Sequence, residues 1–192
     1  MAVTPADDAD DDHASDDCWL TATIARHEGP LILYAQRILA NDLARARDVV
    51  QETFLKLCRT PRPEVAGHEA AWLYTVCRRT ALDVKRKERR MSLIADNTSV
   101  TADALPSSSP DPATATEHAD SAAEVLRMLT LLPENQREAI LLKFGHNLSY
   151  KEIAQVTGHT VSNVGFLIHT GLKRLRTLMQ EIPGDVPAVQ RA

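Results

Sequence analysis

Apolar residues recur along this chain at helical spacing, and long strand-like runs of Val, Ile, Thr and Tyr are missing. The segment after Asn41-Asp42 shows the pattern well, because Val50, Phe54 and Leu57 follow one another at intervals of four and three residues. Such spacing places side chains on one face of a helix. The pattern therefore predicts a helix over about 43–59 with these three residues buried.

Three further helices are predicted around this segment. Upstream, Gly29-Pro30 predicts a break between one helix near 18–28 and another near 31–40, since proline disfavours a helical residue before it. Downstream, a helix is expected over about 68–90, where no glycine or proline interrupts the pattern. Its expected buried residues are Leu73, Val76, Cys77, Ala81 and Val84.

A second helical region carries more specific signals. Ser149 and Glu152 have the spacing of a capping box, which starts a helix that Gly158 is suited to end. Thr160 then caps a longer helix. Its expected buried stripe is Val161, Val164, Ile168, Leu172 and Leu175. A short helix, a glycine turn and a second amphipathic helix predict a helix-turn-helix, a motif typical of DNA-binding proteins.

Polar segments separate and flank these regions. Residues 91–120, with PSSSPDPATAT at their centre, lack apolar periodicity and are too long for a loop within one compact domain. Residues 1–17 are acidic and of low complexity, so we expect them to be disordered. The resulting prediction is an all-α protein with two small helical domains, 18–90 and 121–180, joined by a flexible linker and ending in a tail, 181–192.

Charge is distributed unevenly along the 192 residues. Seven aspartates and no basic residue lie in 1–17, so removing their charges from the net −4 leaves +3 for the remainder. Residues 78–90 hold seven basic residues against Asp83 and Glu88. A basic helix is the electrostatic feature expected of a protein that binds nucleic-acid phosphates, although such runs also occur as solvated helix faces.

Other classes of protein find little support in the sequence. No glycine-rich phosphate loop and no hydrolase or metalloprotease motif occurs, so we expect neither an enzyme nor a cofactor. The seven histidines and three cysteines lack metal-ligand spacing, and we expect no metal. The chain has neither an apolar stretch of roughly 20 residues nor a signal peptide. With unpaired cysteines, a cytoplasmic location is expected.

Both helical regions, in this order, resemble the extracytoplasmic-function (ECF) sigma factors, which keep regions 2 and 4 of the larger sigma family. ARDVVQETFLKLCR (46–59) resembles region 2.2, which docks on the polymerase β′ subunit. AAWLYTVCRRTALDVKRKERR (70–90) is similar to regions 2.3 and 2.4, which melt and read the −10 promoter element. LPENQREAILLKFGHNLSYKEIAQVTGHTVSNV (132–164) resembles region 4, which binds the −35 element and the β flap.

For the first domain, the resemblance implies two sets of site residues. Those expected to bind polymerase core are Asp48, Gln51, Glu52 and Lys56. The alternative for the first three is a solvated polar face, and Glu52 and Lys56 also have the spacing of an i,i+4 ion pair. Those expected at the −10 element are Trp72, Thr75, Arg78, Arg79, Lys85 and Arg86. Trp72 has an alternative role as a core residue. Many family members have Arg-Asn where this chain has Arg78-Arg79, so reading of a −10 base by that asparagine does not carry over.

For the second domain, the expected −35 contacts lie on the second helix of the helix-turn-helix. They are Thr160, Ser162, Asn163, Phe166, His169, Lys173 and Arg174. Family members commonly carry Thr-Val-Lys-Ser-Arg-Leu where this chain has Asn163-Val164-Gly165-Phe166-Leu167-Ile168, so both basic positions are lost. Asn163 can bond an adenine and Phe166 can pack on a thymine methyl group, or Phe166 folds back onto the 134–145 helix.

The resemblance implies a transcription initiation factor that binds the β and β′ subunits of polymerase core and promoter DNA. Members commonly have an anti-sigma factor, which is a further candidate partner. Two alternatives remain open: a sigma-like regulator that does not initiate transcription, and a stand-alone helix-turn-helix regulator, which would leave the first domain unexplained.

Overall fold

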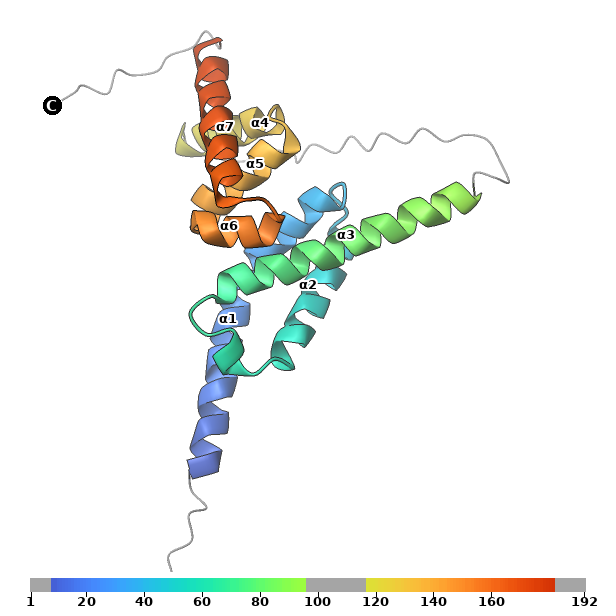
Figure 1. Cartoon of the computed structure of the whole chain (residues 1–192), viewed down its shortest axis with the longest axis vertical. Helices are drawn as coiled ribbons and strands as arrows, with labels where there is room; N and C mark the ends of the chain where they lie inside the picture. The colour runs from blue at the N-terminus through green and yellow to red at the C-terminus, as the bar shows by residue number, and fades with distance from the viewer. Residues whose placement is uncertain (1–7, 96–116, 182–192) are drawn as a thin grey trace, which may run out of the picture. The chain divides into compact units, whose positions relative to one another are not determined.

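A computed structural model describes residues 8–95 and 117–181, which contain helices and turns but no strand, as the sequence predicts (Figure 1). The chain divides into two units, Met1–Ala102 and Asp103–Ala192. The first contains α1 (Asp8–Ile38), α2 (Leu43–Cys58), the short 3-10 helix η1 (Arg62–Glu64) and α3 (Glu69–Ala95). The second contains α4 (Glu117–Thr130), α5 (Glu134–Ile140), the π-helical turn η2 (Leu141–Gly145), α6 (Tyr150–Thr157) and α7 (Val161–Glu181).

The N-terminal unit is a three-helix arrangement in which α1, α2 and α3 all contact one another. Leu31 of α1, Leu57 of α2 and Leu73 of α3 are buried at its centre. Tyr34 and Tyr74 meet edge to face, with ring centroids 5.1 Å apart. An aromatic pair in this geometry adds about 0.5–1.5 kcal/mol to the stability that burial of its area provides.

Helix α1 is continuous from Asp8 to Ile38, so the predicted break at Gly29-Pro30 is wrong. Pro30 lies inside the helix and cannot donate to the carbonyl of Arg26, but Arg26 is exposed and water can bond that carbonyl. The residues that follow Pro30 are buried against α2 and α3, and this packing outweighs the local penalty. The expectation of disorder over 1–17 is also wrong from Asp8 onward, whereas residues 1–7 lie outside the described part.

The predicted helices α2 and α3 are present, with stripes that differ in detail. Val50 and Leu57 are buried as expected, but Phe54 is half-buried and lines a groove with α1. In α3, Leu73, Cys77 and Ala81 are buried, whereas Val76 and Val84 are half-buried. Residues at the edge of an apolar stripe lie where two neighbouring helices meet. Helical periodicity does not determine how deeply such a side chain is buried.

Cys77 offers a direct chemical test of this packing. Burial raises the pKa of its thiol to about 12, against the effect of a hydrogen bond with Thr53, while Cys18 and Cys58 are exposed. Because thiolates are the reactive form, we expect iodoacetamide at about pH 8 to add twice to the folded protein and a third time only after unfolding in urea. Mass spectrometry counts the adducts; rapid triple labelling without urea would contradict the packing.

The same shift has a consequence for stability. In the unfolded chain the thiol ionises near about pH 8.5, well below its pKa in the folded protein. Below about pH 8.5 the buried, protonated thiol therefore makes its full contribution to the free energy of unfolding. Above about pH 8.5 the contribution declines as the pH rises toward the folded pKa.

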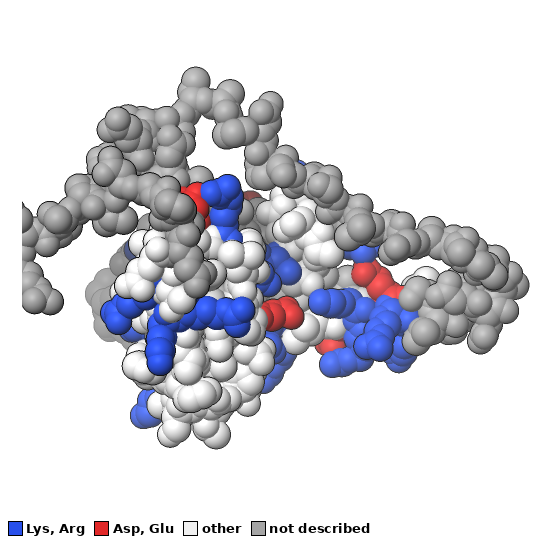
Figure 2. All heavy atoms as spheres, turned by 90° about the horizontal axis from the view of Figure 1, so that it is seen from above, with Lys and Arg blue, Asp and Glu red and all other residues white. Residues whose placement is uncertain are grey.

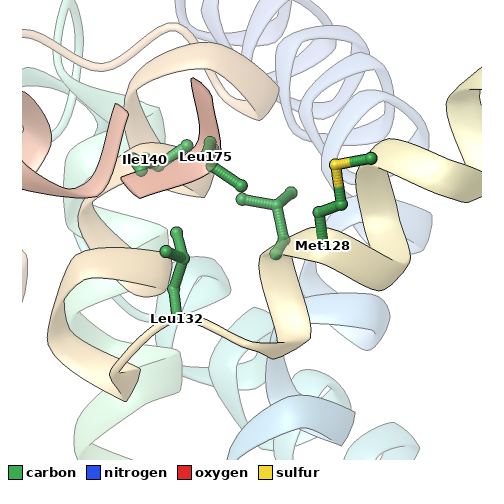
Figure 3. Packing of buried hydrophobic residues seen from close by; sticks show 5 residues of the cluster. Met128, Leu132, Ile140 and Leu175 are labelled. Carbon is green, nitrogen blue, oxygen red and sulfur yellow. The ribbon is translucent and has the colours of Figure 1, made fainter. Parts of the chain in front are cut away.

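The core of the C-terminal unit joins α4, α5 and α7 (Figure 3). Met128, Leu129 and Leu132 pack with Ile140 and Leu175. The closest approach is between α5 and α7: a Cβ atom added to Gly171 would lie 2.6 Å from Cδ1 of Ile140.

The predicted helix-turn-helix is confirmed as α6 and α7. The Ser149 side chain accepts a hydrogen bond from the backbone of Glu152, whose carboxylate accepts one from the Ser149 backbone, forming the capping box. Gly158 ends α6 with a φ of 76° in the left-handed region. The Thr160 hydroxyl accepts from the Asn163 N–H at 3.2 Å, as expected of a cap.

One member of the α7 stripe was wrongly predicted. Val164, Ile168 and Leu175 are buried and Leu172 is half-buried, but Val161 is 46% exposed. Val161 is the first residue of α7, where the helix has only just begun to cross α6. Most of the predicted linker, residues 96–116, lies outside the described part, as do residues 182–192 of the predicted tail; α3 and α4 include its two ends.

Candidate nucleic-acid interface

Helix α2 presents the polar face that the sequence predicts. Asp48, Gln51 and Glu52 are exposed on it. Lys56 has internal partners, because its ammonium lies 2.8 Å from the Glu52 carboxylate and donates to the Thr80 hydroxyl of α3 at 3.1 Å. The i,i+4 pair therefore forms, and Lys56 also links α2 to α3. The outward-facing part of the surface is acidic and amide-bearing.

An apolar groove of about 480 Å³ lies directly beside this polar face. Its floor includes Val50 and Phe54 of α2, and Gln51 belongs to both surfaces. The complete lining is Ile24, Glu28, Ile32, Arg47, Val50, Gln51, Phe54, Leu55 and Cys58. Leu55 is 50% exposed at the rim. An acidic surface next to an apolar groove is suited to a helical protein partner that carries both basic and apolar side chains.

Helix α3 carries the basic surface. Arg79, Lys85 and Arg86 are exposed, and Arg78 is half-buried. Figure 2 shows lysine and arginine side chains gathered over the C-terminal half of this helix. Such a cluster concentrates positive potential where a phosphate backbone could lie.

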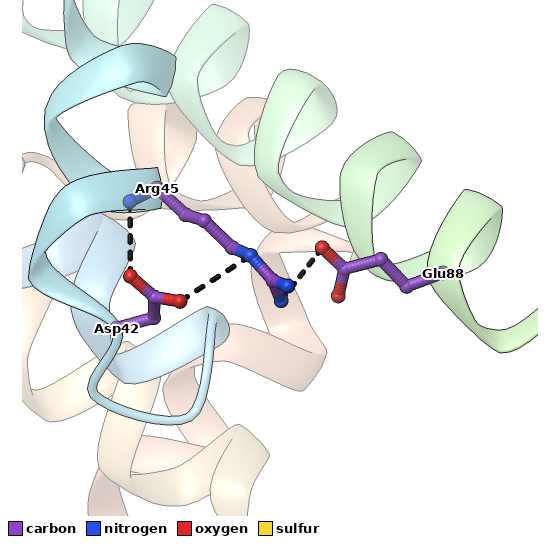
Figure 4. A network of polar contacts seen from close by, with 3 residues as sticks. All are labelled: Asp42, Arg45 and Glu88. Atoms are coloured by element: carbon purple, nitrogen blue, oxygen red, sulfur yellow. Dashed lines mark hydrogen bonds and ion pairs between the residues drawn. The ribbon is translucent and has the colours of Figure 1, made fainter. Parts of the chain in front are cut away.

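Both acidic residues within the basic stretch are in ion pairs. Asp83 lies 2.9 Å from Arg86 on the same helix. Glu88 lies 2.7 Å from Arg45, which also pairs with Asp42 at 3.3 Å (Figure 4). Asp42 caps α2 by accepting from the Arg45 N–H at 3.0 Å. These exposed pairs add little stability, but the Arg45 network ties the basic half of α3 to the start of α2.

The exposure of Trp72 and Thr75 bears on whether they contact the −10 element or, in the case of Trp72, form part of the core. Both are half-buried, so Trp72 is neither a fully enclosed core residue nor an open stacking platform. The Thr75 hydroxyl donates to the Ala71 carbonyl at 2.7 Å. Its oxygen can still accept a hydrogen bond from a nucleic-acid donor.

Sequence reasoning missed the contacts that anchor the N-terminal part of α1. Arg62 of η1 pairs with Asp16 at 3.0 Å, and its guanidinium lies 5.4 Å from the centre of the Trp19 ring. Nothing in helical periodicity signals a contact between residues 46 positions apart. Asp16, one of the seven aspartates of the acidic segment, is therefore paired with η1.

A small polar cluster joins α1 to the start of α3. Burial acts to raise the pKa of Glu69, but hydrogen bonds from its own backbone, the Gly67 N–H and the Trp19 side chain bring it below its usual value. Burial, with Arg26, lowers the pKa of His27, and Glu69 opposes that shift. His27 is thus neutral near pH 7 and adds no charge for binding phosphate.

In the C-terminal unit, the exposed face of α7 contains all the residues that the sequence assigned to it. Thr160 is exposed at the preceding cap. Along the helix the exposed residues are Ser162, Asn163, Phe166, His169, Lys173 and Arg174. The alternative in which Phe166 folds back onto the 134–145 helix, which is α5 and η2, is wrong, since its side chain is 62% exposed.

Within the described ranges, no three histidine, cysteine or acidic residues are grouped to hold a metal ion. None of the helices seen there is long and apolar enough to span a membrane.

Comparison with known protein families matches both units. Residues 23–91 match the family described as Sigma-70 region 2, and residues 122–175 match Sigma-70, region 4. These matches include α2, most of α3, the whole of α6 and most of α7.

Individual relatives belong to the same sigma-factor family as the matched regions. The chain is 30% identical to the ECF RNA polymerase sigma factor SigL of Mycobacterium tuberculosis, across 88% of this chain and 93% of that one. It is 28% identical to the ECF RNA polymerase sigma factor SigE of Mycolicibacterium smegmatis, across 88% of this chain but only 64% of the relative. It thus spans less than two thirds of SigE and nearly the full length of SigL.

Solved structures show the same fold. The sigma factor RpoE in complex with the anti-sigma factor NepR, from Bartonella quintana, aligns with a TM-score of 0.59 at 22% identity, covering 84% of this chain and 96% of that one. CnrH in complex with the cytosolic domain of CnrY aligns at 0.51 and 22% identity, covering 84% and 87%. The chain therefore belongs to the ECF subfamily of RNA polymerase sigma factors, transcription initiation factors that direct RNA polymerase to promoters.

Proposed function

We propose that this chain binds polymerase core through α2 and reads a promoter with α3 and α7. The observation that carries the proposal is the order of two DNA-binding units in one chain, each with its own exposed face. A bacterial promoter has two separated elements, and two units can contact both at once.

Core binding is assigned to the polar face and groove of α2. Asp48, Gln51 and Glu52 offer acceptors to basic residues of the β′ subunit, while the groove beside Phe54 receives apolar side chains. Lys56 contributes by holding Glu52 and by linking α2 to α3.

Contact with the −10 element is assigned to α3. Arg78, Arg79, Lys85 and Arg86 bind phosphates, which fixes the helix on the DNA without reading sequence. Trp72 and Thr75 lie about three turns before the C-terminal basic cluster that begins at Lys85, and line the path of the separated strand, where a half-buried ring can support an unstacked base.

The −35 element is assigned to α7 of the helix-turn-helix. Thr160, Ser162, Asn163 and Phe166 enter the major groove, and His169, Lys173 and Arg174 lie along the same helix toward the backbone.

The chain acts in the cytoplasm as a non-catalytic subunit without a cofactor. An anti-sigma factor is a further proposed partner, supported by the fold shared with RpoE, which was solved bound to NepR, and with CnrH, which was solved bound to a domain of CnrY. The acidic and apolar surface of α2 is one place where such a partner and the polymerase would compete.

The test is transcription in vitro from a promoter library with purified polymerase core and the full chain. We expect specific transcripts that depend on the chain, and substitution of Arg79, Lys85 and Arg86 by alanine should abolish them while core binding persists. If the chain binds core and DNA yet yields no transcript from any library member, the alternative of a regulator that does not initiate transcription is correct.

A further inference from the structure

Phe166 occupies the centre of the outward face of α7. Successive residues of a helix are rotated by about 100°, so Val164, Ile168, Gly171 and Leu175, all buried, define one direction. Phe166 points about 170° away from it, opposite the core. Any surface that α7 meets with its outward face therefore meets this ring.

The residues around Phe166 give the face its chemistry. Asn163 and His169 lie on either side, each about 60° from it, and Ser162 precedes it on nearly the same line. No lysine or arginine occurs in α7 before Lys173, which is about 10 Å farther along the axis. The first half of the face thus carries no lysine or arginine, and its main groups are an amide, an imidazole and an aromatic ring.

A neighbouring aromatic contact extends this surface toward α6. A Cβ atom at Gly165 would lie 3.7 Å from Cε2 of Tyr150, so the Tyr150 ring packs against the α7 backbone next to Phe166. Tyr150 is 40% exposed, and the Lys143 ammonium lies 5.7 Å from its ring centre. The Phe166 ring itself remains 62% exposed, although exposure of a large aromatic ring to water is unfavourable.

We propose that Phe166 determines specificity at the −35 element by packing on the C5-methyl group of a thymine, while Asn163 bonds a neighbouring adenine. This inference rests on the proposed function of α7. A phenyl ring has no donor or acceptor to offer a base edge, and the thymine methyl is the apolar group that the four bases present in the major groove. The preferred element accordingly contains adjacent A·T pairs.

The position of the cations completes the inference. Lys173 lies on the line of Ser162 and Phe166, and Arg174 and Arg176 follow it, so the phosphate contacts of lysine and arginine are confined to the second half of the helix. Base reading and charge neutralisation are separated along α7. Replacing Phe166 should change sequence preference and leave the salt dependence of binding unaltered, whereas replacing Lys173 should lower the salt slope by about one.

The experiment removes a single methyl group from the DNA. The −35 sequence preferred by the holoenzyme is first selected from a randomised library, and each thymine in it is then replaced by deoxyuridine. We expect one position at which this replacement weakens holoenzyme binding about fourfold, the value for loss of one buried methyl group. With Phe166→Ala the same replacement should have no effect.

Phe144→Ala is the matched control, because Phe144 is 63% exposed in the same unit but lies outside α7. It should retain the fourfold methyl effect. Asn163→Ala should relax preference at one neighbouring base pair and keep the methyl effect. A selected −35 element that tolerates deoxyuridine at every thymine overturns the role of Phe166 and leaves the proposed function standing. Failure to select any −35 sequence overturns the proposed function itself.

Discussion

Replacement of Gly171 by leucine is expected to destabilise the C-terminal unit by about 3 kcal/mol. A Cβ atom at this position would lie 2.6 Å from Cδ1 of Ile140 and 3.3 Å from Cβ of Gln136, and leucine adds three more carbons to the same space. Helices α5 and α7 would have to separate, which exposes the core around Leu132 and Leu175. The change in urea unfolding, followed by circular dichroism, measures the loss.

Two matched variants separate overpacking from other effects of losing a glycine. Gly165→Ala adds a methyl group at an ordinary contact distance of 3.7 Å from Tyr150, so it should be neutral or stabilising by up to about 1 kcal/mol through helix propensity. Gly171→Ala should be costly in the wild type and less so together with Ile140→Val, which removes the clashing Cδ1. Equal cost in both backgrounds would show that Ile140 does not limit the approach of the helices.

The features that sequence alone predicted well are local ones. The capping box of Ser149 and Glu152 and the left-handed turn at Gly158 involve residues within a few positions of one another, where backbone chemistry decides the conformation. The start of α7 at Val161 follows from the Thr160 cap in the same way. These three signals fix the helix-turn-helix before any packing is considered.

Errors arose where packing between distant segments prevails over a local preference. Pro30 remains inside α1 because the residues after it are buried against two other helices. The pairing of Arg45 with Glu88 and that of Arg62 with Asp16 join different elements, so no periodic pattern reveals them. Both arginines would otherwise be read as solvated charges on helix or turn surfaces.

The candidate sites show the same division. Periodicity correctly placed Asp48 and Glu52 of α2 on an exposed face. It did not decide whether Phe166 is exposed or folds back onto the 134–145 helix, because both arrangements fit its position in the helical repeat. The Glu52–Lys56 pair formed as its spacing allows, and the bond from Lys56 to Thr80 then gave the lysine a role within the fold. Which exposed residues contact a partner depends on the partner surface, which the chain does not encode.

Reversal of charge at Asp48 and Glu52 is expected to have the largest functional effect. The Asp48→Lys/Glu52→Lys variant would place two cations where we propose that α2 meets basic residues of the β′ subunit. Juxtaposed like charges cost a few kcal/mol, so core affinity should fall by roughly 30-fold, equivalent to about 2 kcal/mol. Competition for core against a labelled sigma factor measures this affinity.

The control is Glu64→Lys/Asp83→Lys, which changes the net charge equally but at exposed residues of η1 and α3. It should bind core with affinity close to that of the wild type, and both variants should keep the helical content of the parent, since all four side chains are exposed. Raising the salt concentration should reduce the deficit of the α2 variant, because added ions screen the new repulsion between exposed charges. A deficit shared equally by the two variants would indicate an effect of overall charge, and a variant at positions 48 and 52 that competes as well as the wild type would exclude the α2 face from the contact with core.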